Sequence, residues 1–140
     1  MSNRSAVNTI KGYFYQFDYS MYQILHQSDQ NNEVTIEGVE DIDIETPEEC
    51  SAIQCKYYSK TEYNHSVIAK PIRLRLKQYS HVILGQEKKI KYHLYGHYKT
   101  GQEKLILPID VNFLKNKFLT YTESKEQIKV HEKLNLSDKD

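Results

Sequence analysis

The order of apolar and polar positions divides the chain into segments with helical spacing and segments with strand alternation. Between residues 6 and 27, apolar side chains recur at intervals of three and four, as they do along one face of a helix. Apolar and polar residues alternate over 39–45 and again over 52–57, which indicates two strands with one apolar face each. Helical spacing returns from Lys70, and alternation returns over 90–98. This order predicts an α/β domain with a mixed β-sheet flanked by helices.

The first predicted helix has clear signals at both ends. Asn8 or Thr9 supplies a cap at its start, and residues 28–32 have the composition of a terminating loop. Its apolar stripe consists of Phe14, Phe17, Met21, Ile24 and Leu25.

A turn joins the first two alternating segments into a hairpin. Residues 46–49 are polar and contain Pro47, which cannot donate to a β-ladder, so the chain reverses there. Gly38 marks a bend or bulge that separates the first arm from a preceding strand over 34–37. The apolar face of the hairpin then consists of Ile42, Ile44, Ile53 and Cys55.

The polar face of the same hairpin gathers groups that suit phosphate chemistry. An antiparallel hairpin with an even-numbered loop places Asp41 and Asp43 opposite Gln54 and Lys56. Hydrolysis of a phosphodiester needs oxygen ligands for a divalent cation and a positive charge near the attacking water. These side chains supply both. The alternative is that they form only the solvated face of an amphipathic hairpin, with cross-strand ion pairs.

These residues resemble a known family. Asp41 followed by Gln54-Cys55-Lys56 resembles the Asp…(Glu/Gln)-x-Lys signature of the PD-(D/E)xK nuclease superfamily, in the Gln variant of its Mrr-like branch. More closely, Gly-Tyr-Phe-Tyr-Gln at 12–16 before the two strands is similar to the N-terminal double-stranded DNA nuclease domain of bacterial anti-phage effectors of the CBASS, AVAST and Lamassu types. The resemblance covers roughly residues 8–80 and implies a restriction-endonuclease-like fold.

The resemblance implies a role for each residue of the motif. Asp41 is the expected principal ligand of Mg²⁺ or Mn²⁺, with the side-chain oxygen of Gln54 and the backbone carbonyl of Cys55 as further ligands. Lys56 is expected to position water and to stabilise the phosphorane transition state. Gln in place of Glu removes one negative charge, so we expect weaker metal binding than in a Glu-x-Lys site unless Glu37 or Glu40 compensates.

Three further residues join this expected site. Asp43 and Glu37 are reserve metal ligands, and Gln16 of the first helix is a fourth catalytic residue or else a surface glutamine.

Gly12 lies inside the first predicted helix, where glycine lowers helix stability, so we expect a structural or functional reason for a glycine at this position. That reason is either an ordinary packing contact or a close approach of the helix start to a DNA backbone or to the hairpin.

Charge is unevenly distributed although its sum is zero. Residues 1–55 hold two Lys or Arg against ten Asp or Glu, whereas 56–104 hold eleven against three. The basic middle of the chain is either a surface that contacts phosphates or an ordinary solvated helix face. Tyrosines interleaved with Lys60 over 57–65 suggest a loop over DNA or half-buried surface residues. The expected DNA contacts are Lys60, Lys70, Arg73 and Lys77.

Several site and compartment classes are disfavoured. The chain has no long apolar run and no signal-peptide pattern at its N-terminus, so we expect a cytoplasmic protein with no membrane partner. Cys50 and Cys55 lack CxxC spacing, which favours free thiols, with Cys55 buried. His93 and His97 have metal-ligand spacing only on a helix, and their segment has the pattern of a strand.

The second half of the chain has weaker signals. Because Pro71 is tolerated in the first helical turn, we expect the second helix to begin near Lys70 and to connect the hairpin with the strand over 90–98. Gly101 predicts a turn, 111–119 a helix and 127–134 a marginal strand. Ser137 with an acidic residue three positions later resembles the start of a further helix.

The length suits one domain over residues 1–140, and the helix signal at 137 suggests the N-terminal part of a longer protein. The leading functional prediction is a Mg²⁺-dependent DNA endonuclease that acts as the effector of a bacterial anti-phage system. Its expected partners are double-stranded DNA and either further copies of itself or a defence complex with a sensor or ATPase part. The alternatives are a catalytically silent nucleic-acid-binding module of the same fold and an adaptor without either role.

Overall fold

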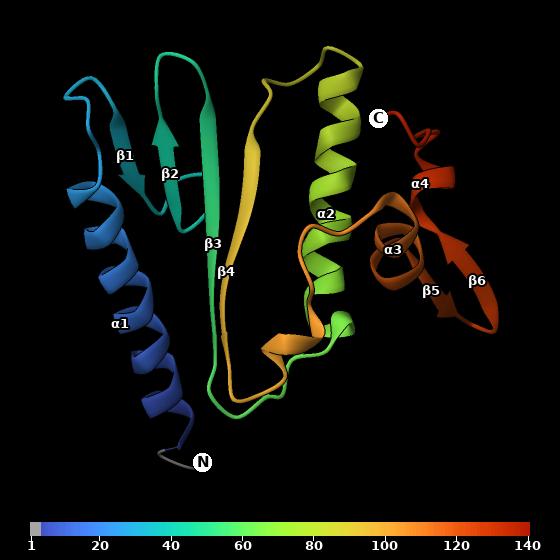
Figure 1. Ribbon diagram of the computed structural model, residues 1–140, viewed down its shortest axis with the longest axis horizontal. Helices are drawn as coiled ribbons and strands as arrows, with labels where there is room; N and C mark the ends of the chain where they lie inside the picture. The colour runs from blue at the N-terminus through green and yellow to red at the C-terminus, as the bar shows by residue number, and fades with distance from the viewer. Residues whose placement is uncertain (1–3) are drawn as a thin grey trace. The chain divides into compact units, whose positions relative to one another are not determined.

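Residues 4–140 form a mixed α/β structure with one four-stranded sheet and one smaller two-stranded sheet (Figure 1). A computed structural model describes residues 4–140. Its elements in chain order are α1 Arg4–Leu25, β1 Glu33–Ile36, β2 Ile42–Glu45, β3 Cys50–Tyr58, α2 His65–Ile83, β4 Lys91–Tyr98, the single turn η1 Gln102–Lys104, α3 Val111–Leu114, the π turn η2 Lys115–Leu119, β5 Thr120–Glu123, β6 Glu126–Lys129 and α4 Val130–Lys133.

The larger sheet has the order β1-β2-β3-β4 and contains both kinds of pairing. β1 with β2 and β2 with β3 are antiparallel, because short turns join them, whereas β3 and β4 are parallel. A parallel pair requires a long crossover, and α2 lies in that connection. The predicted α/β class, the mixed sheet and the strand over 90–98 are therefore confirmed.

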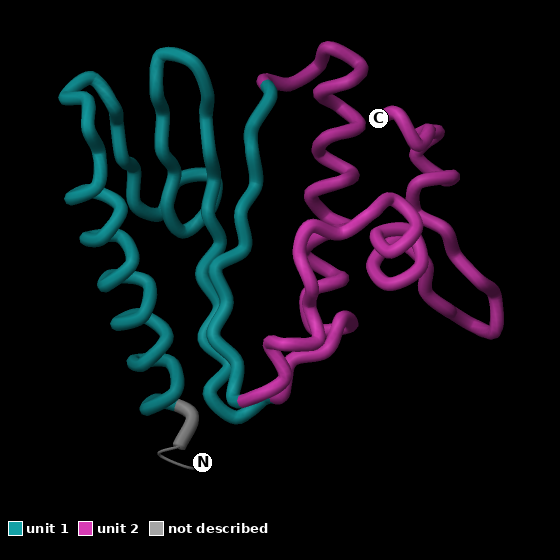
Figure 2. Tube along the Cα trace, viewed as in Figure 1, with its two compact units in different colours: residues 1–61, 89–99 teal, residues 62–88, 100–140 magenta. Residues whose placement is uncertain are grey.

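The chain divides into two compact units (Figure 2). The first contains α1 and the whole four-stranded sheet, and comprises the residues up to Thr61 together with Lys89–Lys99. The second comprises Glu62–Lys88 and Thr100–Asp140, and contains α2 and the two-stranded sheet.

The core of the first unit lies between α1 and one face of the sheet. Its buried residues are Ile42, Ile53 and Cys55, and the tyrosines Tyr15 and Tyr19 of α1 pack against them. Ile42 and Ile53 are direct partners in the β2–β3 ladder, so the alternation of both strands brings their apolar side chains to the same face. The predicted apolar face of the hairpin is confirmed by this packing.

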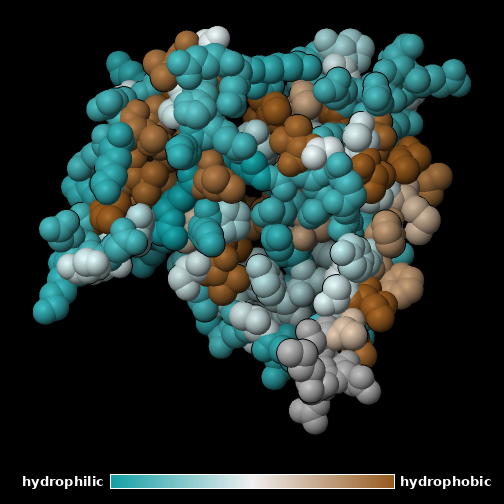
Figure 3. Space-filling view, turned by 180° about the vertical axis from the view of Figure 1, so that it is seen from behind, coloured by the Kyte–Doolittle hydropathy of each residue, from teal (hydrophilic) through white to brown (hydrophobic). Residues whose placement is uncertain are grey.

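The apolar stripe of α1 does not face this core. Tyr15, Gln16 and Tyr19 lie on the buried or half-buried side of the helix, whereas Phe14 is 62% exposed and Phe17 is 50% exposed. The space-filling view shows hydrophobic side chains along the outer side of α1, on the right of Figure 3. An apolar stripe shows that one face of a helix favours burial, but it does not identify the surface against which that face packs.

Two glycines of this unit have different environments. A Cβ at Gly38, in the turn between β1 and β2, would lie 2.2 Å from Oδ2 of Asp43, so this predicted bend position requires glycine for space. A Cβ at Gly12 in α1 would meet nothing within 4 Å. A packing contact therefore does not explain Gly12, and the alternative of an approach to DNA stays a prediction.

The second unit is built around α2, which starts earlier than predicted. Asn64 caps it, since its side chain accepts a hydrogen bond from the N–H of Val67. This strong cap places Pro71 inside the helix rather than in its first turn, so the predicted start near Lys70 is wrong. Gly101 adopts a positive φ of 88° as expected for a turn, and a Cβ there would lie 2.9 Å from the carbonyl oxygen of Tyr63. The most deeply buried side chains of this unit are Tyr63 and Phe118.

The C-terminal part of the second unit corrects one prediction and refines another. The expected helix over 111–119 is present, but its second half is the π turn η2. The expected strand over 127–134 is wrong beyond Lys129, because α4 begins at Val130. A strand that the sequence did not indicate, β5, pairs with β6 across a turn whose residues Ser124 and Lys125 have positive φ. Ser137 and Asp140 do form the side-chain to backbone bond of a capping box, at 2.7 Å.

Candidate active site at the start of strand β2

The hydrogen-bonded pairing of β2 with β3 ends at Ile42 and Ile53. Beyond this pair, a side-chain carboxylate takes the place of the backbone acceptor that a longer strand would supply. Asp41 directly precedes β2, and its Oδ2 atom accepts a hydrogen bond of 2.6 Å from the backbone N–H of Cys55. A carboxylate can take this place because a strand N–H without a ladder partner needs another acceptor. The bond fixes the Asp41 side chain against the middle of β3.

Gln54 and Lys56 flank the residue that Asp41 binds. Strand alternation directs both toward the face of β3 opposite Cys55, and both are half-buried. Extending the β2–β3 register by one step places Asp41 beside Gln54. The structure therefore brings Asp41 to the Gln54–Lys56 segment of β3, as the sequence predicted.

The ionisation of Cys55 reflects these neighbours. Burial first, and the negative charge of Asp41 second, raise the pKa of the Cys55 thiol to about 12, while the positive charge of Lys56 partly offsets the rise. The thiol is consequently neutral at physiological pH. Cys50 and Cys55 are both buried and neither forms a disulfide, and the burial predicted for Cys55 is confirmed.

Asp43 has a different setting from the one predicted. It lies opposite Ala52, not opposite Gln54 or Lys56. Its two carboxylate oxygens accept hydrogen bonds from the N–H groups of Val39 and Glu40, at 2.5 and 3.1 Å, and the residue is 7% exposed. Asp43 therefore holds the turn that precedes β2. The face assignment was correct, but the predicted partners were wrong, because the hairpin closes at the Glu45–Cys50 pair and this register sets Asp43 opposite Ala52.

Gln16 and Glu37 bind each other. Nε2 of Gln16, which is 7% exposed, donates to Oε1 of Glu37 at 2.5 Å, and the backbone N–H of Glu37 donates to the carbonyl of Asp41 at 3.0 Å. A chain of hydrogen bonds therefore runs from α1 through the β1–β2 turn to Asp41 and on to β3. The N–H of Glu37 therefore holds the backbone of Asp41, while the N–H of Cys55 holds its carboxylate.

The groups near Asp41 that could bind a metal ion are all oxygens. Oδ1 of Asp41, the side-chain oxygen of Gln54 and the carbonyl of Cys55 belong to one short stretch of the sheet. Within residues 4–140, no three His, Cys, Asp or Glu side chains converge on a common point. One carboxylate with neutral oxygens fits Mg²⁺, which proteins commonly hold through one or two carboxylates together with substrate phosphates.

The predicted DNA contacts fall in both units. Lys60 lies just after β3 in the first unit, and the other three lie on α2 in the second. Lys70 and Lys77 are exposed, and their spacing with Arg73 places all three on one side of the helix. The Arg73 guanidinium lies 4.3 Å from the centre of the Tyr121 ring, so a cation–π contact fixes it.

An aromatic stack over the sheet was missed by the sequence reasoning. Tyr95 of β4 lies between Tyr15 and Tyr19 of α1, with ring centres 5.0 and 3.6 Å away. His97 stacks on Tyr57 at 5.0 Å. The signal for this cluster was the i, i+4 spacing of the two helix tyrosines opposite an aromatic strand. Part of the stack is open, in a shallow pocket lined by Tyr15, Asp18, Tyr19, Tyr22 and Tyr95.

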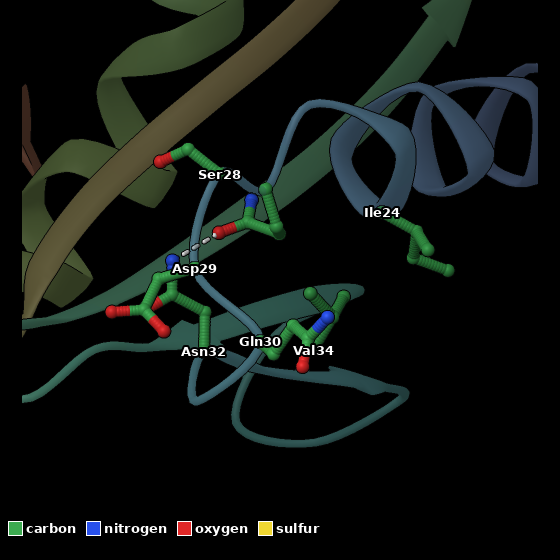
Figure 4. A pocket seen from close by; sticks show the side chains of 7 residues that line it. Ile24, Ser28, Asp29, Gln30, Asn32 and Val34 are labelled. Atoms are coloured by element: carbon green, nitrogen blue, oxygen red, sulfur yellow. Dashed lines mark hydrogen bonds between the residues drawn. The ribbon is translucent and has the colours of Figure 1, made fainter.

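A second hollow lies at the predicted loop after α1. The amide of Asn32 donates to the side-chain oxygen of Gln27 at 2.9 Å, which ties the two ends of the loop together (Figure 4). Oδ1 of Asp29 accepts hydrogen bonds from the backbone and side chain of Asn31. These polar groups already bind one another, so the hollow has the character of a structured loop.

Comparison with known proteins gives no relative. No family model, curated protein or solved structure matches the chain. Among the residues that the structure describes, no helix is both long enough and apolar enough to cross a membrane. The resemblance of the motif to PD-(D/E)xK nucleases stays a prediction.

Proposed function

We propose that the chain is a metal-dependent DNA endonuclease with Asp41, Gln54 and Lys56 in its active site. The observation that supports this most directly is the bond between the Asp41 carboxylate and the N–H of Cys55. That bond places an acidic group at the centre of the Gln-x-Lys segment, although Asp41 and Cys55 are far apart in sequence.

The proposed roles follow from the chemistry of each group. Asp41, Gln54 and the carbonyl of Cys55 would hold Mg²⁺ or Mn²⁺, which when bound supplies Lewis acidity at the scissile phosphate. Lys56 places a positive charge near the attacking water and stabilises the extra negative charge of the phosphorane. Gln16 acts through Glu37 and the turn, so it is a positioning residue in this proposal.

The site has a low negative charge for a metal centre. Asp41 contributes one carboxylate, while Asp43 is bound to its turn and Glu37 to Gln16. We therefore propose weak metal binding in the absence of DNA, with phosphate oxygens of the substrate completing the coordination. The proposed setting is the bacterial cytoplasm, where the domain would act in anti-phage defence as a homo-oligomer or with a sensor or ATPase part. This setting is supported by the resemblance of the motif.

One assay tests the proposal. Purified protein is incubated with supercoiled plasmid and Mg²⁺ or Mn²⁺, with EDTA in a parallel reaction. We expect cleavage that EDTA prevents, that Lys56→Ala abolishes, and that Lys129→Ala retains. Lys129 is a suitable control because it is an exposed lysine that pairs with Glu132 in the second unit. Full cleavage by a well-folded Lys56→Ala variant would end the nuclease assignment.

The second candidate is a nucleic-acid-binding module without catalysis. The open part of the tyrosine stack favours it, since aromatic faces bind unpaired bases by stacking. In that case plasmid stays intact with every metal, while a gel shift shows binding that weakens as salt rises. A chain that neither cleaves nor shifts nucleic acid would instead be an adaptor.

A further inference from the structure

A continuous apolar stripe runs along the side of α1 that faces away from the sheet. It consists of Val7, Ile10, Phe14, Phe17, Met21 and Ile24, which follow one another at alternating steps of three and four. Each of these side chains is between 50% and 62% exposed. Hydrophobic side chains gather along this side of the molecule (Figure 3). This alternation is the a and d pattern of a coiled-coil seam, with Val7, Phe14 and Met21 at a positions.

The stripe and the sheet-facing side of α1 are separate surfaces. Tyr15, Gln16 and Tyr19 already bind the sheet or the β1–β2 turn, and successive residues of a helix are about 100° apart. The stripe therefore points almost opposite to them. Its centre is a shallow apolar hollow lined by Ile10, Tyr13, Phe14 and Phe17.

We propose that this stripe is a self-association surface, on which the α1 helix of a second copy packs in antiparallel orientation. In an antiparallel pair each a position faces a d position. Val7 then faces Ile24 of the second copy, Ile10 faces Met21, and Phe14 faces Phe17. The two-fold axis repeats the same three contacts, so all six side chains of each stripe find a partner.

The charges beside the stripe favour this orientation. Lys11 and Asp18 lie on the flank of the stripe and both occupy e positions, and antiparallel helices bring e positions of the two copies together. In the register above, Lys11 lies about two residues, or roughly 3 Å of helix rise, from the level of Asp18 of the second copy. Two opposite-charge pairs form, one on each side of the two-fold axis.

A parallel pair lacks this match. It would place Lys11 next to Ala6 and Asp18 next to Tyr13, because e positions then meet g positions.

The size of the surface also fits a second copy. Six half-exposed side chains leave roughly 600 Å² on each copy, or about 1,200 Å² for a pair, which is at the lower end of specific interfaces. We therefore expect a reversible dimer whose population depends on concentration.

Sedimentation equilibrium of the purified chain over a range of concentrations tests the surface. We expect a monomer–dimer equilibrium that Phe14→Glu removes. Leu74→Glu is the matched control, because Leu74 is an apolar helix residue that is 54% exposed but lies on α2. Circular dichroism of both variants checks that the fold is retained. A wild-type chain that stays monomeric throughout, or a Phe14→Glu variant that dimerises as well as the control, would overturn the proposal.

Charge reversal tests the pairing of Lys11 with Asp18. We expect Lys11→Asp or Asp18→Lys alone to raise the dimer dissociation constant roughly tenfold, since each change puts two like-charge pairs into the dimer. The double variant restores opposite pairs and should regain most of the wild-type affinity. Additive weakening in the double variant would contradict this pairing.

Cysteine cross-linking tests the orientation. In the antiparallel dimer, a chain with both Val7→Cys and Ile24→Cys should form an intermolecular disulfide under mild oxidation. Val7→Cys alone should not, because the two copies of residue 7 are then about 25 Å apart along the helices. The native cysteines are buried and do not compete. Cross-linking by Val7→Cys alone would show a parallel pair, and a partner other than a second copy would leave every variant uncross-linked.

Discussion

Gly38 leaves the space that the carboxylate of Asp43 occupies. A Cβ at residue 38 would lie 2.2 Å from Oδ2 of Asp43, well inside van der Waals contact. We expect Gly38→Ala to displace this carboxylate from the N–H groups of Val39 and Glu40 and to lower the free energy of unfolding by about 2 kcal/mol. Urea denaturation measures the change. An unaltered midpoint would show that the turn can rearrange without loss.

Gly12→Ala should have the opposite effect on stability. A Cβ at residue 12 meets nothing within 4 Å, and alanine is the better helix former, so we expect a gain of up to about 1 kcal/mol. Plasmid cleavage by the same variant separates the two explanations of this glycine. Unchanged cleavage means that the helix start does not approach DNA closely, whereas reduced cleavage in a stabilised protein would support such an approach.

Asp41 and Asp43 should respond differently to the same substitution. Asp41→Asn is expected to abolish metal-dependent cleavage, because it removes the charge from the proposed ligand. Asp43→Asn replaces one acceptor of the turn by a donor, so we expect a loss of about 1–2 kcal/mol in stability and weaker cleavage as a consequence. Denaturation and cleavage are measured on both variants. The reverse pattern would show that Asp43 is the main ligand.

The thiol of Cys55 gives a prediction for alkaline pH. Its pKa is about 12 in the folded chain, whereas an unperturbed thiol has a pKa near 8.5. Above pH 9 the unfolded chain loses a proton that the folded chain keeps, so this group's contribution to stability is complete below pH 8.5 and is lost as pH rises toward 12. We expect stability to fall over that range.

Comparison with Cys55→Ala isolates this contribution. Burial also raises the pKa of Tyr15, Tyr19 and Tyr63, so part of the alkaline loss will persist in the variant. We expect the variant's stability to decline less steeply with pH than that of the wild type. Parallel curves would mean that Cys55 ionises normally in the folded chain.

Cleavage should depend on protein concentration if two copies must act on opposite DNA strands. We expect the rate per molecule to rise as protein concentration increases through the dimer range, and fusion to a dimerisation module should raise the rate at low concentration. The Phe14→Glu variant should lose the first effect and keep the second. Equal rates per molecule at every dilution, with no gain on fusion, would reject clustering as the activating step.

The hairpin and its apolar face were predictable because strand alternation is a local signal. Ile42, Ile53 and Cys55 alternate with polar residues, and the same residues form the core. The pairing of Asp41 with the middle of β3 was predictable for the same reason, since the loop length sets the register. The turn bonds of Asp43 were not, because they depend on the path of the chain over 37–41 and not on its alternation.

The orientation of α1 was beyond the reach of the sequence pattern. Phe14 and Phe17 carry the strongest helical periodicity, yet Tyr15 and Tyr19 contact the sheet. Tyrosine is intermediate in hydrophobicity, so a periodicity analysis assigns the buried face to phenylalanine. The predicted start of α2 was wrong for a different reason. The cap at Asn64 starts the helix early, although Pro71 was expected to lie in the first turn. The first error reflects a long-range contact with Tyr95 of the sheet, and the second reflects a local cap.

The tyrosine stack also makes the first unit optically distinctive. The chain has twelve tyrosines and no tryptophan, so its near-ultraviolet absorption and dichroism arise mainly from tyrosine rings. Tyr19 and Tyr95 lie with ring centres 3.6 Å apart and planes inclined by 12°, a geometry in which their electronic transitions couple. Because one ring belongs to α1 and the other to β4, detachment of the helix would remove this coupling while the backbone signal persists. Near-ultraviolet dichroism therefore reports the docking of α1 on the sheet without an added label.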